Sequence, residues 1–252
     1  MSKTKSTDEL HSHKKQALQN VEDYLNKLIA SEDSHDNGKA DKLCYWLKDW
    51  MTFLDFEKSF SPMSLRRYKR GEIVKVHLGF NVGSEEGGLH YAVVLDKNNA
   101  KSSPVVTVVP LTSVKPHTDT TNLKNGSIFL GNELFTNLNS KISMVDRKVK
   151  SEIDKLEKLV ADASKKASSE HFSTIDTKLG TARKELELLA KMRAEVLKMK
   201  HGSIALVSQI TTVSKIRIYD PQTDHDILSG IKLSNEKLDL IDYEIRKSFT
   251  NF

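Results

Sequence analysis

The sequence predicts an α+β fold in which a small antiparallel β-barrel is combined with several helices. Between residues 73 and 130, and again between 202 and 218, short β-branched runs alternate with turn residues, a pattern typical of compact antiparallel barrels. Before, between and after these runs, apolar residues recur at intervals of three and four, which predicts helices.

Two helices are predicted near the start of the chain. The apolar positions of 8–30 share one helical face, and a second helix is predicted over about 39–58, after a polar loop at 31–38. The second helix carries both tryptophans. We predict that residues 1–62 are a helical extension that packs on the rest of the molecule or on a second copy. A surface that stacks RNA bases is the alternative.

The second predicted domain, 63–252, contains the strands. A basic stretch leads into the first of them, and a glycine-rich loop at 79–88 separates it from the second. Strands are predicted at 73–78, 91–95, 105–109, 127–130, 202–207, 210–213 and 216–218.

Residues 141–200 interrupt this pattern with two stretches of helical periodicity, separated by a serine-rich and charged reversal at 164–174. We predict an inserted antiparallel coiled-coil hairpin whose charged residues form a solvated face. An arm that binds nucleic acid is the alternative. A last helix is predicted after Ser234, which is placed to act as its N-cap.

Composition narrows the functional classes. The 39 Lys and Arg against 34 Asp and Glu give a net charge of +5, which is compatible with a nucleic-acid partner without establishing one. The single cysteine, Cys44, excludes a disulfide framework and metal sites built from several thiolates. No stretch approaches the roughly 18–20 apolar residues of a membrane span, and the polar start lacks a secretory signal. We therefore expect a cytoplasmic protein that makes no membrane contact.

Four stretches of the strand-rich part resemble one known family. They are Lys69–Val74, Gly83–Val94, Val109–Ser113 and Gly202–Lys215. In this order, and with a helix at the end, they resemble the MazF/PemK family of toxin endoribonucleases over about 66–135 and 201–250. The N-terminal extension and the 141–200 hairpin lie outside the family's usual compact form.

The resemblance implies an SH3-like barrel, commonly a homodimer, with a groove that takes single-stranded RNA. It implies metal-independent cleavage of mRNA, without a cofactor, in which the RNA 2′-hydroxyl attacks the adjacent phosphate. A cognate antitoxin is expected to occupy the groove and to block it.

The resemblance also identifies candidate site residues. The catalytic threonine of the family corresponds to Thr112, and the position of its catalytic arginine holds His90. Histidine lacks the permanent charge and the fork of arginine, but it transfers protons near neutral pH. We predict that His90 and Thr112 are catalytic, and that the following residues bind RNA: Glu85, Gly87, Gly88, Ser113, Gln209, Thr211, Arg70 and Lys75.

The replacement of the family's catalytic arginine by His90 also supports a second interpretation. Thr211 also stands where the family has an arginine, so two basic groups of the expected groove are replaced. The alternative function is a catalytically inactive binding module that serves protein assembly or RNA binding.

Overall fold

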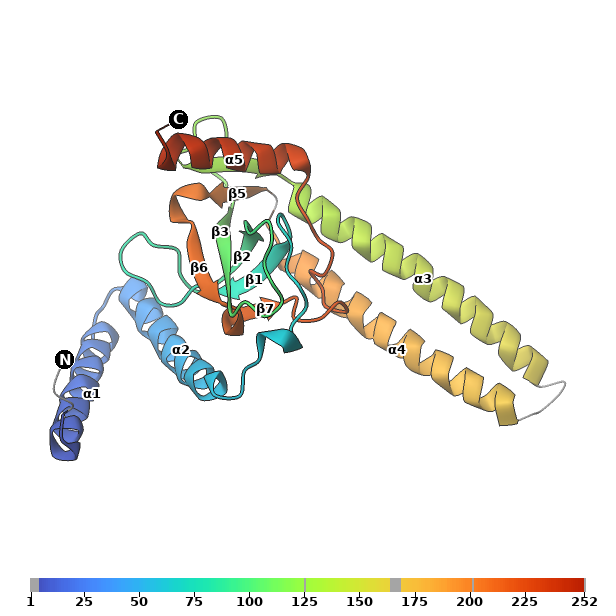
Figure 1. Cartoon of the computed structure of the whole chain (residues 1–252), viewed down its shortest axis with the longest axis horizontal. Helices are drawn as coiled ribbons and strands as arrows, with labels where there is room; N and C mark the ends of the chain where they lie inside the picture. Colours follow the sequence, from blue (N-terminus) through green and yellow to red (C-terminus); the bar gives the residue numbers. More distant parts are fainter. Residues whose placement is uncertain (1–4, 125, 164–168, 201, 252) are drawn as a thin grey trace. The chain divides into compact units, whose positions relative to one another are not determined.

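A computed structural model describes residues 5–124, 126–163, 169–200 and 202–251. Within these residues the chain has an α+β fold, with one antiparallel sheet of seven strands and five α-helices (Figure 1). The predicted α+β class is therefore confirmed, whereas closure of the sheet into a barrel stays a prediction.

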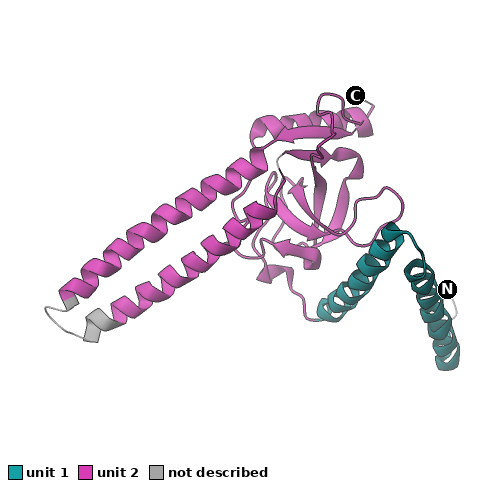
Figure 2. Ribbon diagram, turned by 180° about the vertical axis from the view of Figure 1, so that it is seen from behind, with its two compact units in different colours: residues 1–58 teal, residues 59–252 magenta. Residues whose placement is uncertain are grey.

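The chain divides into two compact units, Met1–Lys58 and Ser59–Phe252 (Figure 2). No helix in the described part of the chain combines the length and the apolar character that crossing a membrane requires.

The first unit consists of two helices, α1 (Thr7–Ile29) and α2 (Ser34–Glu57). The helix predicted over 8–30 is confirmed, but α2 begins earlier than predicted. The Asp33 side chain accepts a hydrogen bond from His35 N (2.8 Å) and so caps the helix at this point. The second half of the predicted loop at 31–38 is therefore helical.

The second unit contains all the strands. They are β1 (Ile73–His77), β2 (Leu89–Val94), β3 (Val105–Ser113), β4 (Ser127–Gly131), β5 (Ser203–Leu206), β6 (Thr211–Ser214) and β7 (Ile218–Asp220). Their order is β4-β5-β3-β2-β1-β7, and β6 also pairs with β3. Among the described residues, no strand pairing joins β4 to β7, so these two strands are at the ends of the strand order.

The central strand β3 is longer than the predicted 105–109 because three strands pair with it. Its first residues pair with β6, the stretch Val108–Pro110 pairs with β2, and Leu111–Ser113 pair with β5. Strand β2 likewise begins at Leu89, two residues before the prediction. The N-terminal end of β2 and the C-terminal end of β3 therefore lie beside each other, because the two strands are antiparallel.

Both faces of the sheet are buried, as the alternation of side chains along the strands requires. Ile73, Val93 and Val109 belong to a core that also includes side chains of the inserted helices and of the last helix. Val76 and Val94, which point to the other face, belong to a second core with Tyr68.

The inserted hairpin consists of α3 (Glu133–Ala163) and α4 (Ser169–Lys198), and the chain ends with α5 (Asn235–Phe249). Helix α3 begins eight residues before the predicted 141 because Leu134 and Leu138 are buried in the core. Of the predicted reversal at 164–174, residues 164–168 lie outside the described part, and the remainder is helical.

The N-cap prediction for the last helix is confirmed. The hydroxyl of Ser234 accepts a hydrogen bond from Lys237 N at 3.3 Å, which satisfies one of the unpaired N–H groups at the start of α5.

Candidate functional site

A cavity of about 630 Å³ lies between the glycine-rich loop, the middle of β3 and the segment around β6. Its lining is mostly polar. The lining residues are Leu78, Asn81, Ser84, Glu85, Glu86, Pro110, Ser208, Gln209, Ile210, Thr211, Val213 and Arg217.

Backbone contacts close the loop that forms one wall of this cavity. Gly88 N donates to Gly79 O (2.6 Å), and Leu78 N donates to Gly88 O (2.7 Å). A Cβ atom at Gly87 would lie 2.8 Å from Gly79 O, and Gly88 has a φ of +83°. Both positions therefore require glycine for the shape of the loop. Their predicted contact with RNA stays a prediction.

The two loop carboxylates lie in the cavity wall, but they have different environments. The exposed Glu85 accepts from Val82 N (3.3 Å) and so stabilises the turn of the loop. Glu86 is half-buried, and its backbone N–H donates to the side chain of Gln209 (2.6 Å). Gln209 also donates to Ser84 O (3.2 Å). Gln209 thus fixes the loop from the opposite side of the cavity.

His90 lies at the start of β2, opposite Val76 of β1. Its Nδ1 lies 3.2 Å from Leu111 O, and its Nε2 lies 3.4 Å from Glu86 Oε2. Carbonyl and carboxylate oxygens accept hydrogen bonds, so both ring nitrogens can donate only when the ring is the charged imidazolium. The His90 ring therefore lies between two oxygen acceptors, one of them a carboxylate.

Thr112 is the residue after the one whose carbonyl His90 contacts. It is half-buried in the C-terminal part of β3, where its Cα partner is Ile204 of β5. The structure thus brings His90 and Thr112 to adjacent strand ends. Ser113, the next residue, is exposed at the end of β3 and is not part of the cavity lining.

Arg70, which was predicted to bind RNA, contacts the last helix instead of the cavity. It donates to Leu95 O (2.6 Å), and it forms an ion pair with Asp242 of α5. In this structure Arg70 therefore joins the sheet to α5.

Lys75 contacts the inserted hairpin. It forms an ion pair with Glu195 of α4, and its ammonium lies 5.4 Å from the centre of the Tyr91 ring. Glu195 also accepts a hydrogen bond from the Tyr91 hydroxyl. Lys75 thus joins β1 to the base of α4, away from the cavity lining.

Arg217 is a cavity residue that was not predicted from the sequence. Among the described residues that line the cavity, it is the one with a cationic side chain. It lies in a short 3₁₀ turn, η3 (Lys215–Arg217), and not in the strand predicted at 216–218. Its Nε donates to His77 O (2.7 Å), and burial lowers the pKa of Arg217, although the guanidinium stays charged.

Thr211 begins β6 opposite Val108 of β3 and lines the cavity. Three predicted site residues, Glu85, Gln209 and Thr211, therefore line the same cavity together with Arg217. Arg217 could have been identified because it comes two residues after Gly202–Lys215, the last stretch that resembles the family.

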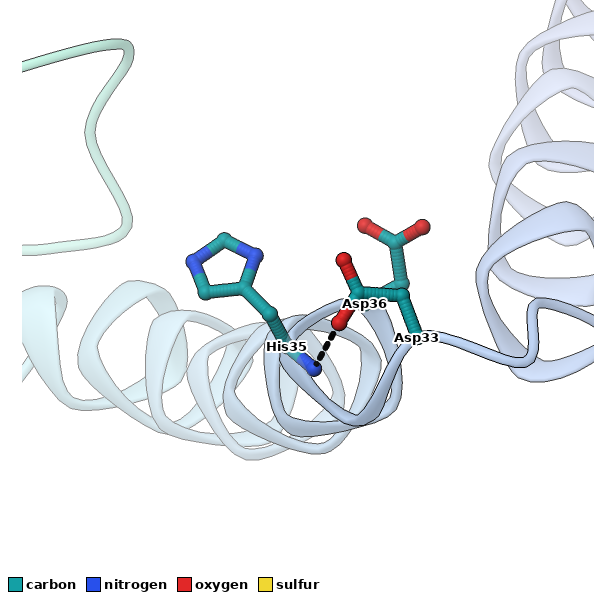
Figure 3. Close-up of side chains that lie close together, drawn as sticks. All are labelled: Asp33, His35 and Asp36. Atoms are coloured by element: carbon teal, nitrogen blue, oxygen red, sulfur yellow. Dashed lines mark hydrogen bonds between the residues drawn. The ribbon is translucent and has the colours of Figure 1, made fainter.

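One group in the first unit has the composition of a metal site. The possible ligand atoms of Asp33, His35 and Asp36 lie within 4.8 Å of one another. Figure 3 shows the imidazole on one side and the two carboxylates on the other, with the hydrogen bond from His35 N to Asp33 between them. Because Asp33 caps α2, this group is explained by the start of the helix.

Comparison with known families places the cavity loop and β1–β4 in a recognised domain. Residues 69–183 match the family described as PemK-like, MazF-like toxin of type II toxin-antitoxin system. The match includes His90 and Thr112 but ends at Arg183, within α4, so it does not extend to Gln209 or Arg217. No curated protein matches the chain in the corresponding search.

Proposed function

We propose, from the premise that residues 69–183 form a PemK/MazF-like toxin domain, that the protein is an endoribonuclease toxin that cleaves single-stranded mRNA. The observation that carries the proposal is the pair of His90 and Glu86 beside the polar cavity that the glycine-rich loop of this domain helps to line. A histidine and a carboxylate in contact provide the proton transfers that RNA cleavage by its own 2′-hydroxyl requires.

In the proposed reaction the 2′-oxygen attacks the adjacent phosphorus, and the bond from phosphorus to the 5′-oxygen breaks. Glu86 accepts the proton of the 2′-hydroxyl, and the imidazolium of His90 gives a proton to the leaving 5′-oxygen. The products are a 2′,3′-cyclic phosphate and a free 5′-hydroxyl. No step needs a metal ion or another cofactor.

Charge builds up on the phosphate oxygens during this attack, and donors aimed at them lower the barrier. Thr112, beside the residue that His90 contacts, would donate its hydroxyl to one of these oxygens. Arg217 would supply positive charge from the opposite wall of the cavity. Gln209 would act indirectly, by holding the backbone of Glu86 in place.

The remaining parts of the proposal come from the family match. The sheet would close into the family's SH3-like barrel, two copies would form a homodimer, and a peptide of a cognate antitoxin would occupy the cavity. We also propose that 1–62 and 63–252 are the functional divisions of the chain, with the hairpin as an insertion in the second.

The alternative proposal is that the protein is a binding module without nuclease activity. Binding of a nucleic-acid backbone depends on Lys and Arg at the phosphates. Here Arg70 and Lys75 are engaged with Asp242 and Glu195, and the cavity wall contains two carboxylates. This charge distribution favours a polar protein segment over RNA as the occupant.

The two functions are separated by incubating the purified protein with a long mixed-sequence RNA in EDTA. If the protein is a nuclease toxin, we expect RNA fragments with defined ends. If it is a binding module, we expect the RNA to stay intact and the protein to form a stable complex with a peptide partner.

A further inference from the structure

The inserted hairpin has an apolar groove on one face. The groove has a volume of about 490 Å³ and runs between α3 and α4. Four large aliphatic side chains along it are each between 38% and 50% exposed: Ile153, Val160, Leu179 and Leu186. Apolar side chains that gather in this way, rather than being scattered singly, indicate a surface that contacts another molecule.

The spacing of these side chains indicates which kind of partner fits. Ile153 and Val160 are seven residues apart on α3, and Leu179 and Leu186 are seven residues apart on α4. Figure 1 shows the two helices side by side. A heptad interval on both helices of a pair is the pattern that packs against a second helical pair in a four-helix bundle.

The charges in the groove add an element of self-complementarity. From the base of the hairpin toward its tip, each helix presents an apolar, a charged and an apolar side chain: Ile153, Glu157 and Val160 on α3, and Leu186, Arg183 and Leu179 on α4. Glu157 on α3 and Arg183 on α4 both line the groove, so the two helices present opposite charges to it.

In the described part of the chain, these two charges form no ion pair. The ion pairs that join α3 to α4 are formed by other side chains, namely Lys148 with Glu185, Lys178 with Glu152, and Arg193 with Asp146. Among the described residues, neither Glu157 nor Arg183 has an ion-pair partner.

We propose that this groove docks on the same groove of a second copy of the chain. A two-fold axis along the hairpins would set α3 of each copy on α4 of the other. Ile153 would then face Leu186, and Val160 would face Leu179. Glu157 of each copy would meet Arg183 of the other, so that the ion pair forms twice, as two-fold symmetry requires.

Charge reversal tests this arrangement without disturbing the core of the hairpin. Glu157→Arg alone would set two arginines against each other on both sides of the axis, and Arg183→Glu alone would do the same with two glutamates. We expect each variant to associate roughly tenfold or more weakly than the wild type in sedimentation velocity experiments at increasing concentration. Any association through the sheet domain would remain in all variants.

Mixing the two variants makes the test specific for contact between copies. When one copy carries the Glu157→Arg substitution and the other carries Arg183→Glu, every facing pair again has opposite charges. We expect the mixture to recover the association of the wild type, whereas either variant alone does not. Circular dichroism checks that each variant is folded.

The matched control is Asp154→Arg, the same charge change at an exposed position of α3 outside the groove. It should associate like the wild type. The proposal is overturned if the wild type and both groove variants sediment alike over the whole concentration range, or if mixing the two variants fails to restore association.

Discussion

Gln209 holds the backbone of Glu86, because its side-chain oxygen accepts the Glu86 N–H at 2.6 Å. Its side-chain nitrogen donates to Ser84 O at 3.2 Å, so one amide group fixes two points of the glycine-rich loop. The two residues are 123 positions apart in the chain and are separated by the whole inserted hairpin. The position of the Glu86 carboxylate beside His90 therefore depends on the segment that follows the insertion.

Replacing Gln209 should impair the site more than the fold. In Gln209→Ala the loop loses both hydrogen bonds, so we expect a loss of about 1 kcal/mol of unfolding free energy. We also expect at least a tenfold lower rate of RNA cleavage, because Glu86 is no longer held. Ser208→Ala, in the same cavity wall, is the control and should keep the wild-type rate. Equal rates for Gln209→Ala and the wild type would disprove the role of this contact.

The residue at position 90 should accept arginine better than alanine. His90→Ala removes the proposed acid, and we expect the cleavage rate to fall by roughly 100-fold or more. His90→Arg restores a permanent charge and a fork for phosphate oxygens, so measurable cleavage should remain. The control is His117→Ala, in an exposed loop after β3. A His90→Arg protein that is folded but no faster than His90→Ala contradicts the prediction.

The two arginines that the structure separates should behave differently toward RNA. Arg217→Gln removes the cation of the cavity, and we expect the slope of log K against log salt for single-stranded RNA to decrease by about 0.7. Arg70→Ala should leave that slope unchanged and lower the melting temperature, because Arg70 pairs with Asp242 of α5. Fluorescence anisotropy in the His90→Ala background measures the slopes. A lower slope for Arg70→Ala would show that the RNA path extends to α5.

Glu195 should stabilise the attachment of α4 to the sheet in a pH-dependent way. Burial raises the pKa of Glu195, but hydrogen bonds from Lys75 and Tyr91 outweigh this effect, and the net result is a lowered pKa. The folded state therefore favours the charged form of Glu195, and this form stabilises the protein at pH values above 4.5, the ordinary pKa of glutamate. Its contribution to stability is lost as the pH falls through the folded-state pKa.

Glu195→Gln should accordingly lower the unfolding free energy by about 1–3 kcal/mol at pH 7. The difference from the wild type should shrink below pH 4.5, as urea denaturation at several pH values would show. Glu187→Gln is the control, because Glu187 pairs with Lys191 on the exposed surface of the same helix, where such pairs contribute little. A difference that stays constant down to low pH would rule out the charged pair as the cause.

The parts of the fold that could be predicted are those encoded by local patterns. The β-branched runs predicted seven strands, the last of them two residues early, and the three-and-four spacing predicted the five helices, because a buried face imposes its period on the sequence. Ser234 was recognised as a cap because capping needs only residues within one turn. The start of α2 was missed because Asp33, another cap, lies in a stretch that is polar throughout.

The candidate site was less predictable, because its organisation depends on contacts between distant segments. Arg70 and Lys75 precede or form the first strand, as expected of groove residues, yet their partners lie 172 and 120 positions away. No local sequence pattern identifies Asp242 or Glu195 as those partners. His90 was found only through the resemblance, since a single histidine at a strand end has no signature of its own.

The nuclease function is tested most directly by mapping the RNA ends after incubation with the purified protein in EDTA. We expect fragments that carry a 2′,3′-cyclic phosphate on one side of the cut and a 5′-hydroxyl on the other, and we expect His90→Ala to produce far fewer of them. RNA that stays intact with folded wild-type protein would contradict the nuclease function, and cleavage that is unchanged in His90→Ala would contradict the role of His90.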